Sequence, residues 1–314
     1  EQGCQAGMTY LARPDAVAAR KDPHLLLPGC RSILCLAAPY PSPQASTPSD
    51  PEHPRGIISA YAALPDYHEE LRSRLQLLTA RLGKLTGHPF HSKACVDSLP
   101  MFEKYYAQCS GLGWIGRNTL LTAPAYGSWL FLAELLTELE LEPTSPVPSN
   151  QCLECDRCVQ ACPTGALLPN RTIDARKCLS YLTIEHRGPI PEAYRPLLGL
   201  HVFGCDICQS ACPYNHTALS AGFTGIFLPM VEQHPELFSE FALSEADFTR
   251  KYQGTPVLRA RYQSYRRNVA IALGNSGSRA AIPFLQQALK DEPDPLIVGA
   301  CHWALEQLGT TLTP

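Results

Sequence analysis

The 314-residue sequence has no apolar run of membrane-spanning length and no strong excess of charge. Its longest apolar run lies around Trp129 to Leu136 and is interrupted at Glu134, whereas a spanning helix needs about 20 apolar residues. The 26 basic and 29 acidic residues give a net charge of −3, so affinity for nucleic acid has to come from a local basic patch. We find no secretory signal, which predicts a cytoplasmic protein.

Cysteine is abundant, and eight of the 14 cysteines follow one pattern. The first run holds four cysteines at spacings of two, two and three residues with a proline directly after: Cys152, Cys155, Cys158, Cys162 and Pro163. Bacterial ferredoxins hold iron–sulfur clusters with such a run. A second run holds three cysteines before a proline: Cys205, Cys208, Cys212 and Pro213. The nearest upstream candidate for its missing ligand is Cys178, so the chain can hold two 4Fe-4S clusters.

The ligand sets follow from how such runs fold. Three closely spaced cysteines wrap one cluster, while the cysteine before the proline ligates the other. One cluster is therefore expected on Cys152, Cys155, Cys158 and Cys212, and the second on Cys162, Cys178, Cys205 and Cys208. Zinc sites or disulfides are the alternative, but zinc sites usually show two separated Cys-x-x-Cys pairs. The other six cysteines are expected to be small buried apolar residues: Cys4, Cys30, Cys35, Cys95, Cys109 and Cys301.

The chain divides into three expected domains: an α/β or α+β domain at 1–149, the cluster domain at 150–217 and a helical domain at 218–314. In the first domain, residues 31–39 predict a buried strand that is followed by a Pro/Ser-rich loop. Asp66 begins a helix, with Glu69 completing a capping box. A strand at 88–96, a helix with Pro100 in its first turn and its end near Gly111, and a strand at 127–132 follow.

The helical domain contains a weak internal repeat. Residues 268–274 resemble residues 300–306, about 32 positions later. This period is typical of stacked helix pairs of the HEAT type. Two copies are too few for a free solenoid, so we expect them to dock on the rest of the chain.

Two further stretches stand out. Residues 111–119 carry three glycines in six residues, which lets the backbone pass close to a ligand or to another backbone, but their spacing matches neither a dinucleotide fingerprint nor a phosphate loop. Residues 250–267 contain six basic and no acidic side chains, with three tyrosines interleaved. A solvated helix face explains such a run, and so does an RNA-binding face that offers phosphate contacts and stacking platforms.

Several segments together resemble the epoxyqueuosine reductase family, the iron–sulfur and cobalamin enzymes that complete queuosine in transfer RNA. The resemblance covers nearly the whole chain, from Met8-Thr-Tyr-Leu-Ala-Arg13 to the HEAT-like tail. Its other segments are Arg20 with Asp22-Pro23, Asp66-Tyr67-His68, Val96-Asp97-Ser98, residues 112–119, Gly127-Ser-Trp129 and both cysteine runs. Family members usually carry an additional N-terminal segment that is absent here, and Arg117 stands where they commonly have lysine.

The resemblance implies a nitroreductase-like domain that holds cobalamin with its lower ligand displaced. The two 4Fe-4S clusters would pass single electrons to cobalt from an external low-potential donor, and the epoxide of the wobble base would lose its oxygen. Asp97 would protonate that oxygen, with a pKa raised by burial. The implied cobalamin contacts are Arg20, Tyr61, His68, Asp97, Gly116, Asn118 and Thr119. The implied tRNA contacts are Arg259, Arg261, Arg266 and Arg267.

Two other functions are compatible with the cysteine runs. A corrinoid reductive dehalogenase would share the cobalamin domain and both clusters, but a small substrate needs neither a HEAT-like tail nor a basic run. A ferredoxin-like electron carrier would need only the middle third of the chain and would bind no cobalamin. We therefore expect a tRNA-modifying reductase that works as a monomer and does not bind a membrane.

Overall fold

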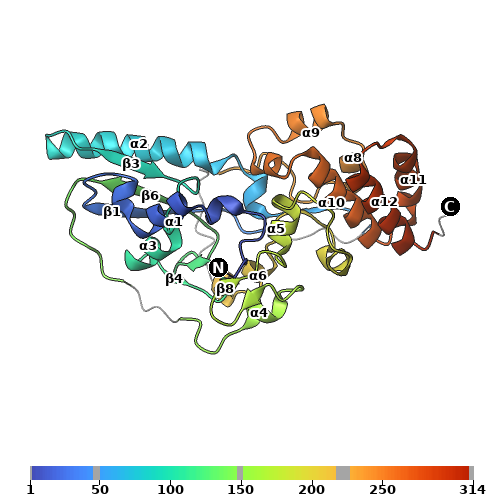
Figure 1. Cartoon of the computed structure of the whole chain (residues 1–314), viewed down its shortest axis with the longest axis horizontal. Coiled ribbons are helices and arrows are strands. Elements are labelled where there is room, and N and C mark those ends of the chain that lie inside the picture. The colour runs from blue at the N-terminus through green and yellow to red at the C-terminus, as the bar shows by residue number, and fades with distance from the viewer. Residues whose placement is uncertain (1, 45–49, 147–150, 217–226, 311–314) are drawn as a thin grey trace.

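The computed structural model describes residues 2–44, 50–146, 151–216 and 227–310, which form an N-terminal lobe, a cluster lobe and a helical lobe (Figure 1). The N-terminal lobe comprises residues 2–146, the cluster lobe 151–216 and the helical lobe 227–310. The expected domain boundaries at 149/150 and 217/218 fall outside the described residues, as does linker residue Pro148.

A three-stranded antiparallel sheet forms the centre of the N-terminal lobe. Its order is β1 (Ser32–Pro39), β6 (Leu130–Thr137) and β3 (Ser92–Cys95). The strand expected at 31–39 is confirmed. The strand expected at 127–132 instead runs to Thr137, because Glu134 is fully buried in the sheet and does not interrupt it.

Helices lie on both faces of this sheet. Helix α2 (Tyr67–Thr86) begins after Asp66, whose side chain accepts from the His68 N–H, and ends at Gly87 in a left-handed conformation. The expected cap is confirmed, although the bond goes to His68 and not to Glu69. The apolar side of α2 packs with Phe131, Ala133 and Leu135 of β6. Helix α3 (Glu103–Cys109) begins after Phe102, so Pro100 precedes it and is not in its first turn.

The remaining elements of the N-terminal lobe are short. They are η1 (Thr9–Leu11), α1 (Pro14–Lys21), η2 (Pro23–Leu25), β2 (Ile57–Ile58), η3 (Ala60–Ala63), β4 (Trp114–Ile115) and β5 (Leu121–Thr122). Strands β4 and β5 pair with each other. Strand β2 pairs in parallel with β9 (His201–Phe203), so the segment that carries η3 joins the N-terminal lobe to the other two.

The cluster lobe is made of short helices and hairpins. It contains α4 (Arg157–Ala161), β7 (Leu167–Leu168), β8 (Thr172–Ile173), α5 (Leu179–Ile184), η4 (Glu192–Tyr194), η5 (Pro196–Leu198), β9, α6 (Ile207–Ser210) and α7 (Pro213–His216). The loop before β6 docks on this lobe: Ser128 N donates to Asn215 Oδ1 at 2.6 Å and Gln209 Nε2 donates to Ser128 O at 2.9 Å. Gly127 (φ +64°) has no room for a Cβ against Asn215.

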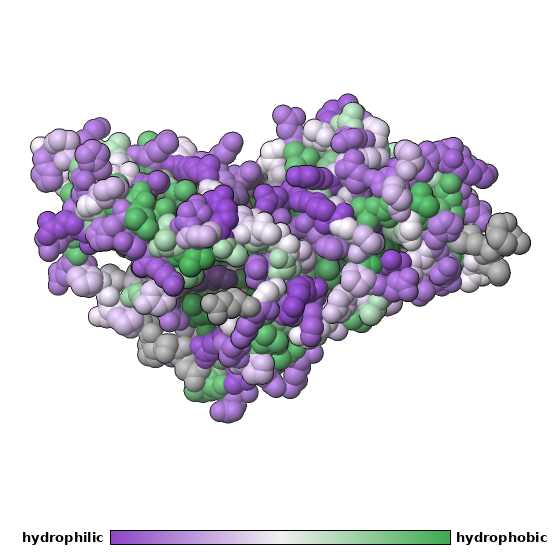
Figure 2. Space-filling model, in the orientation of Figure 1, coloured by the Kyte–Doolittle hydropathy of each residue, from purple (hydrophilic) through white to green (hydrophobic). Residues whose placement is uncertain are grey.

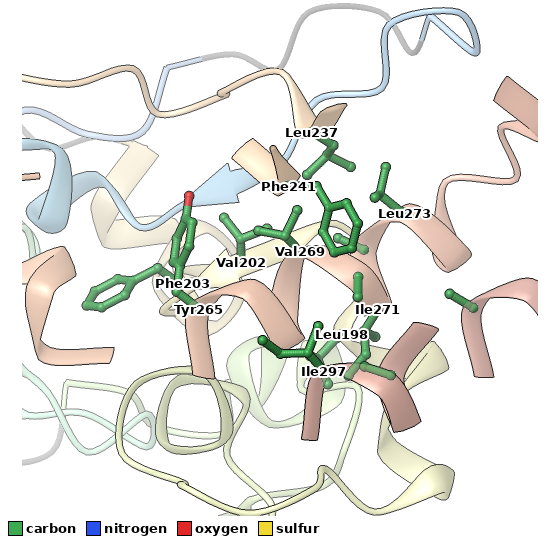
Figure 3. Packing of buried hydrophobic residues seen from close by; sticks show 14 of the residues in the cluster. Leu198, Val202, Phe203, Leu237, Phe241, Tyr265, Val269, Ile271, Leu273 and Ile297 are labelled. Carbon is green, nitrogen blue, oxygen red and sulfur yellow. The ribbon is translucent and has the colours of Figure 1, made fainter. Parts of the chain in front are cut away.

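The helical lobe contains the largest core. Its elements are α8 (Leu237–Phe241), α9 (Glu245–Lys251), η6 (Pro256–Ala260), α10 (Tyr262–Asn275), η7 (Arg279–Ala281), α11 (Ile282–Asp291) and α12 (Pro295–Gln307). Figure 3 shows α10 residues Val269, Ile271 and Leu273 packed among side chains of β9, α8 and α12. Asn268 donates to the Thr183 and Val202 carbonyls. The two similar segments therefore lie in α10 and α12, and α10 docks on the cluster lobe as expected.

Over the described ranges, no helix is both long and apolar enough to span a membrane.

Candidate active site and cluster pockets

The first expected cysteine set lines one pocket of about 360 Å³. Cys152, Cys155 and Cys158 come from the loop and start of α4, and Cys212 comes from the end of α6. The N-terminal lobe closes the pocket with the β4–β5 turn. Burial raises the pKa of the Cys158 thiol to about 11, with further contributions from Cys212 and Cys152. The four thiolates therefore lie together.

The second expected set gathers behind the first. Burial raises the pKa of Cys205 to about 12, and the neighbouring thiolates of Cys178 and Cys162 contribute. The pKa of Cys208 is raised by burial and then by Cys205 and Cys178. Cys158 of the first set also raises the pKa of Cys208, so the two sets lie near each other and their division into two ligand sets stays a prediction.

Among the residues that the structure describes, no group of three histidine, cysteine or acidic side chains is arranged to hold a single metal ion.

Asp97 lies in the loop after β3, beside the start of α2. Its carboxylate accepts from Tyr67 Oη at 2.9 Å and lies 3.6 Å from His68 Nε2. The His68 ring is held from its other side by Asp66, with Nδ1 at 2.7 Å from Oδ1. Asp97 has φ +51°, a left-handed conformation that is uncommon for residues other than glycine. Such strain persists only where the surroundings fix it.

The pKa of Asp97 differs from the expectation. Hydrogen bonding with His68 and then Tyr67 holds the pKa of Asp97 below its usual range, although burial opposes this. The expectation of a raised pKa is therefore wrong, because these partners stabilise the carboxylate. Hydrogen bonding to Asp97 and Asp66 in turn raises the pKa of His68, against burial. The contact between the two side chains thus favours the charged form of each.

A second carboxyl group supports the Asp97 backbone. Glu103, the first residue of α3, accepts the Asp97 N–H at 2.5 Å through Oε1. Burial, with the nearby Asp97, raises the pKa of Glu103 to about 7. The adjacent Lys104 Nζ donates to the Thr119 carbonyl at 2.8 Å, which ties α3 to the β4–β5 turn. Sequence reasoning missed Tyr67 and Glu103, although Tyr67 stands inside the quoted Asp66-Tyr67-His68 segment.

Four side chains from the three lobes lie near one another at the Asp97 site: Tyr10, Asp97, Glu185 and Arg259. We call this group the mouth of the site. Burial raises the pKa of Tyr10, the Glu185 and Asp97 carboxylates raise it further, and Arg259 opposes them. The Arg259 guanidinium is held by Glu185 in a two-point ion pair, with Nε–Oε1 at 2.8 Å and Nη2–Oε2 at 3.3 Å. Figure 2 shows a hollow on this face of the molecule between the N-terminal lobe and the cluster lobe, with hydrophobic residues beside it. Sequence reasoning missed Tyr10, although it stands inside the quoted Met8-Thr-Tyr-Leu-Ala-Arg13 segment, and it missed Glu185, which no motif marked.

The implied cobalamin contacts fall into three places. His68 lies against Asp97. Tyr61, from η3, is buried, which raises the pKa of its hydroxyl, and the Asp206 and Asp97 carboxylates raise that pKa further. Gly116 and Asn118 line the first cysteine pocket, and Thr119 follows them in the same turn. Arg20 lies in α1, where its Nη1 donates to the Leu11 carbonyl at 2.8 Å.

Glu134 is an additional buried carboxyl group in the N-terminal lobe. It lies on β6 opposite Cys35 and Cys95, and both of its oxygens lack a hydrogen-bond partner within the described part of the chain. Burial raises its pKa to about 9, so it is neutral at pH 7. Buried polar groups are nearly always satisfied, so the unpartnered Glu134 carboxyl is an exception within this lobe.

The basic run behaves differently from the expectation. Arg267 is 1% exposed and donates to the Leu182, His186 and Gly188 carbonyls, so its assignment to tRNA is wrong. Arg266 is mostly buried and paired with Glu292, so its side chain is not available for tRNA either. Tyr252 and Tyr265 are buried around Glu240 and offer no stacking surface.

Two arginines of the run remain available for RNA. Arg259 is half exposed beside the site. Arg261 is exposed at the start of α10, and within the described residues its side chain has no hydrogen bond or ion pair.

Comparison with protein families gives three matches. Residues 20–98 match the family described as "Epoxyqueuosine reductase QueG, DUF1730". Residues 151–215 match a 4Fe-4S double cluster binding domain, and residues 255–313 match HEAT repeats. The expected fold class and the HEAT repeat are thereby confirmed.

Characterised relatives match over nearly the whole chain. An epoxyqueuosine reductase of Pseudomonas aeruginosa is 38% identical over 315 residues, which cover 99% of this chain and 86% of the relative. One of Salmonella typhimurium is 38% identical over 305 residues, covering 96% and 77%.

Solved structures agree. An epoxyqueuosine reductase bound to a tRNA-Tyr epoxyqueuosine-modified stem loop superposes with a TM-score of 0.83 at 32% identity, covering 91% of this chain and 76% of the other. A Bacillus subtilis epoxyqueuosine reductase, described with its catalytic aspartate loop swung out of the active site, gives 0.85 at 31% identity, covering 93% and 77%.

Proposed function

The chain belongs to the epoxyqueuosine reductase family, and we propose that it reduces epoxyqueuosine to queuosine at the wobble position of the tRNA anticodon. The observation that carries this proposal is the junction of the lobes. There Asp97 pairs with His68, Asp97 and Arg259 both act on Tyr10, and the β4–β5 turn lines the first cysteine pocket. A ferredoxin-like carrier would need the cluster lobe alone.

The 4Fe-4S double cluster domain supplies single electrons at low potential. We assign Cys152, Cys155, Cys158 and Cys212 to one cluster and Cys162, Cys178, Cys205 and Cys208 to the other. We propose that an external low-potential donor feeds them and that the protein works as a monomer.

We propose cobalamin as the cofactor of the N-terminal lobe. The unpartnered, neutral Glu134 carboxyl fits a lobe that accepts a large polar ligand. Tyr61 and His68 would hold the ligand near Asp97, Gly116, Asn118 and Thr119 would border it toward the first cluster, and Arg20 would support the N-terminal edge. Cobalamin, when bound, supplies the low-potential cobalt chemistry that cleavage of a carbon–oxygen bond needs.

Asp97 and His68 deliver the proton that the departing oxygen requires. His68 is the source of that proton, because hydrogen bonds to Asp97 and Asp66 raise its pKa and so favour its protonated form. Asp97, ionised and oriented by the Tyr67 hydroxyl and by Glu103, relays it from His68 to the oxygen. The relay places a proton beside the site without requiring a neutral aspartic acid in the resting enzyme.

The RNA contacts are Arg259 and Arg261. Both are exposed at the end of η6 and the start of α10, close to the mouth that Tyr10 and Glu185 also line. Guanidinium groups at this position can contact phosphates of an anticodon loop while the modified base enters the mouth.

The test is an anaerobic turnover assay with reconstituted clusters, a chemical reductant and tRNA carrying epoxyqueuosine. Nucleosides are read by mass spectrometry with and without added cobalamin. Loss of one oxygen only when cobalamin is present supports substrate, cofactor and reaction together. An unchanged nucleoside, in protein with intact clusters and bound cobalamin, would exclude the substrate.

A further inference from the structure

Two buried N–H donors border the first cysteine pocket without a partner. Trp114 Nε1 and Asn118 Nδ2 are the buried side-chain nitrogens that lack a hydrogen bond within the described residues. Both side chains line the pocket that also contains Cys152, Cys155, Cys158 and Cys212. An unsatisfied buried donor is costly, so an acceptor is expected at this place.

The turn between β4 and β5 is built to present these donors. Gly116 N donates to the Leu120 carbonyl at 2.9 Å, and Leu120 N donates to Asn118 Oδ1 at 3.3 Å. Because the amide oxygen of Asn118 serves the turn, its Nδ2–H groups are left for an acceptor outside it. A Cβ on Gly113 would collide with the Thr122 carbonyl, so the tight approach of the two strands requires glycine at this position.

Trp114 is equally constrained. Its ring packs edge-on against Tyr214 at 4.8 Å between centroids, and Tyr214 Oη donates to the Gln151 carbonyl at 3.0 Å. The indole is therefore fixed by the strand on one side and by the cysteine-bearing loop on the other. Such fixed donors can hold a hydrogen bond of defined direction.

We propose that the Trp114 and Asn118 side chains donate hydrogen bonds to sulfur atoms of the first 4Fe-4S cluster and thereby raise its reduction potential. The inference rests on the cluster ligand set given under the proposed function. Hydrogen bonds to cluster sulfurs stabilise the added electron, and they are one of the ways by which proteins set cluster potentials.

The unpartnered donors belong to the first cysteine set. Both side chains line the pocket of that set, whereas Cys162 of the second set accepts from the Ala166 N–H at 3.3 Å. The proposed effect of Trp114 and Asn118 therefore applies to the first cluster, which borders the turn that Lys104 ties to α3.

Nitrogen labelling tests the tryptophan donor directly. The chain has three tryptophans, so incorporation of indole-¹⁵N tryptophan labels only Trp114, Trp129 and Trp303. Pulsed EPR of the full chain with both clusters reconstituted and reduced is expected to show a ¹⁵N coupling. The coupling should vanish in Trp114→Phe and persist in the matched controls Trp129→Phe and Trp303→Phe. Its absence from the wild-type chain would overturn the role of Trp114.

Redox titration tests the potential. Asn118→Asp keeps the oxygen that caps the Leu120 N–H but removes the donor, and Asn118→Leu removes both. With iron and sulfide content equal to wild type, both variants and Trp114→Phe should shift one cluster to a more negative potential and leave the other unchanged. Unshifted potentials in all three would overturn the proposal. Neither measurement uses RNA or cobalamin, so a failed turnover assay leaves this result standing, and the reverse also holds.

Discussion

At the scale of single residues, the site depends on a strained aspartate whose charge is fixed by its neighbours. Asp97 sits at φ +51° with its carboxylate on Tyr67 and His68 and its amide on Glu103. Sequence could indicate the residue, because Val96-Asp97-Ser98 is a family motif. It could not give the direction of the pKa, because that depends on side chains from α2 and α3 that approach only in the fold.

Asp97→Asn should lower kcat by about 10² to 10⁴-fold, the usual contribution of a positioned proton donor. Asparagine tolerates a positive φ well, so the loop should keep its shape. Cobalamin and RNA binding should remain near wild type, measured by spectral titration and filter binding. Single-turnover reduction of epoxyqueuosine reports the chemical step. Retention of wild-type single-turnover rates would remove Asp97 from the relay.

The pH dependence of kcat should follow His68. Its pKa lies above the usual 6.5 because of Asp97 and then Asp66, so turnover should fall as pH rises through that value. Asp66→Asn keeps an N-cap for α2 but removes one negative charge beside His68. The pKa of His68 should then fall, and the alkaline limb of the kcat–pH profile should move to lower pH. Asp294→Asn, the same change at the cap of α12, is the control. Identical limbs in Asp66→Asn and wild type would contradict the role of His68.

At the scale of elements, the sequence predicted segments whose pattern is local. The strand at 31–39 and the cap of helix α2 rest on local pattern, and the structure confirms both. The first cysteine set lines one pocket, and the assignment of ligands to two clusters stays a prediction. Prediction from the sequence failed where the burial of a residue depends on partners that are distant in the sequence. Glu134 was read as a break in an apolar run, but it lies inside β6. Arg266 and Arg267 were read as a surface, but α10 is buried against the cluster lobe.

Helix α10 offers a direct test of that packing. A Cβ on Gly274 would lie 2.8 Å from the Ala304 Cα of α12 and 3.1 Å from the Trp303 ring. Gly274→Ala should therefore lower the free energy of unfolding by about 1–3 kcal/mol, the usual effect of overpacking, despite the better helix propensity of alanine. Gly299→Ala in α12, which has open space around it, is the matched control and should not destabilise. Thermal unfolding measures both, and equal midpoints would refute tight α10–α12 contact.

At the scale of the whole molecule, function depends on the junction of three lobes. The N-terminal lobe contributes Asp97 and Tyr10, the cluster lobe Glu185, and the helical lobe Arg259. A chain with near-neutral net charge thus concentrates two exposed arginines beside one mouth. Elsewhere in the basic run, Arg250 pairs with Asp247, Lys251 pairs with Glu240, and buried Arg267 donates to backbone carbonyls. RNA affinity should therefore be local and separable from the fold.

Arg259→Ala and Arg261→Ala should each weaken binding of the anticodon stem loop and lower the slope of log affinity against log salt by about one. Neither side chain is part of a core, so thermal stability should change little. Arg250→Ala, an exposed arginine of the same run on α9, is the control and should bind like wild type. Equal losses in all three variants would mean that RNA senses only the overall charge. A loss confined to positions 259 and 261 would locate the anticodon at the mouth of the Asp97 site.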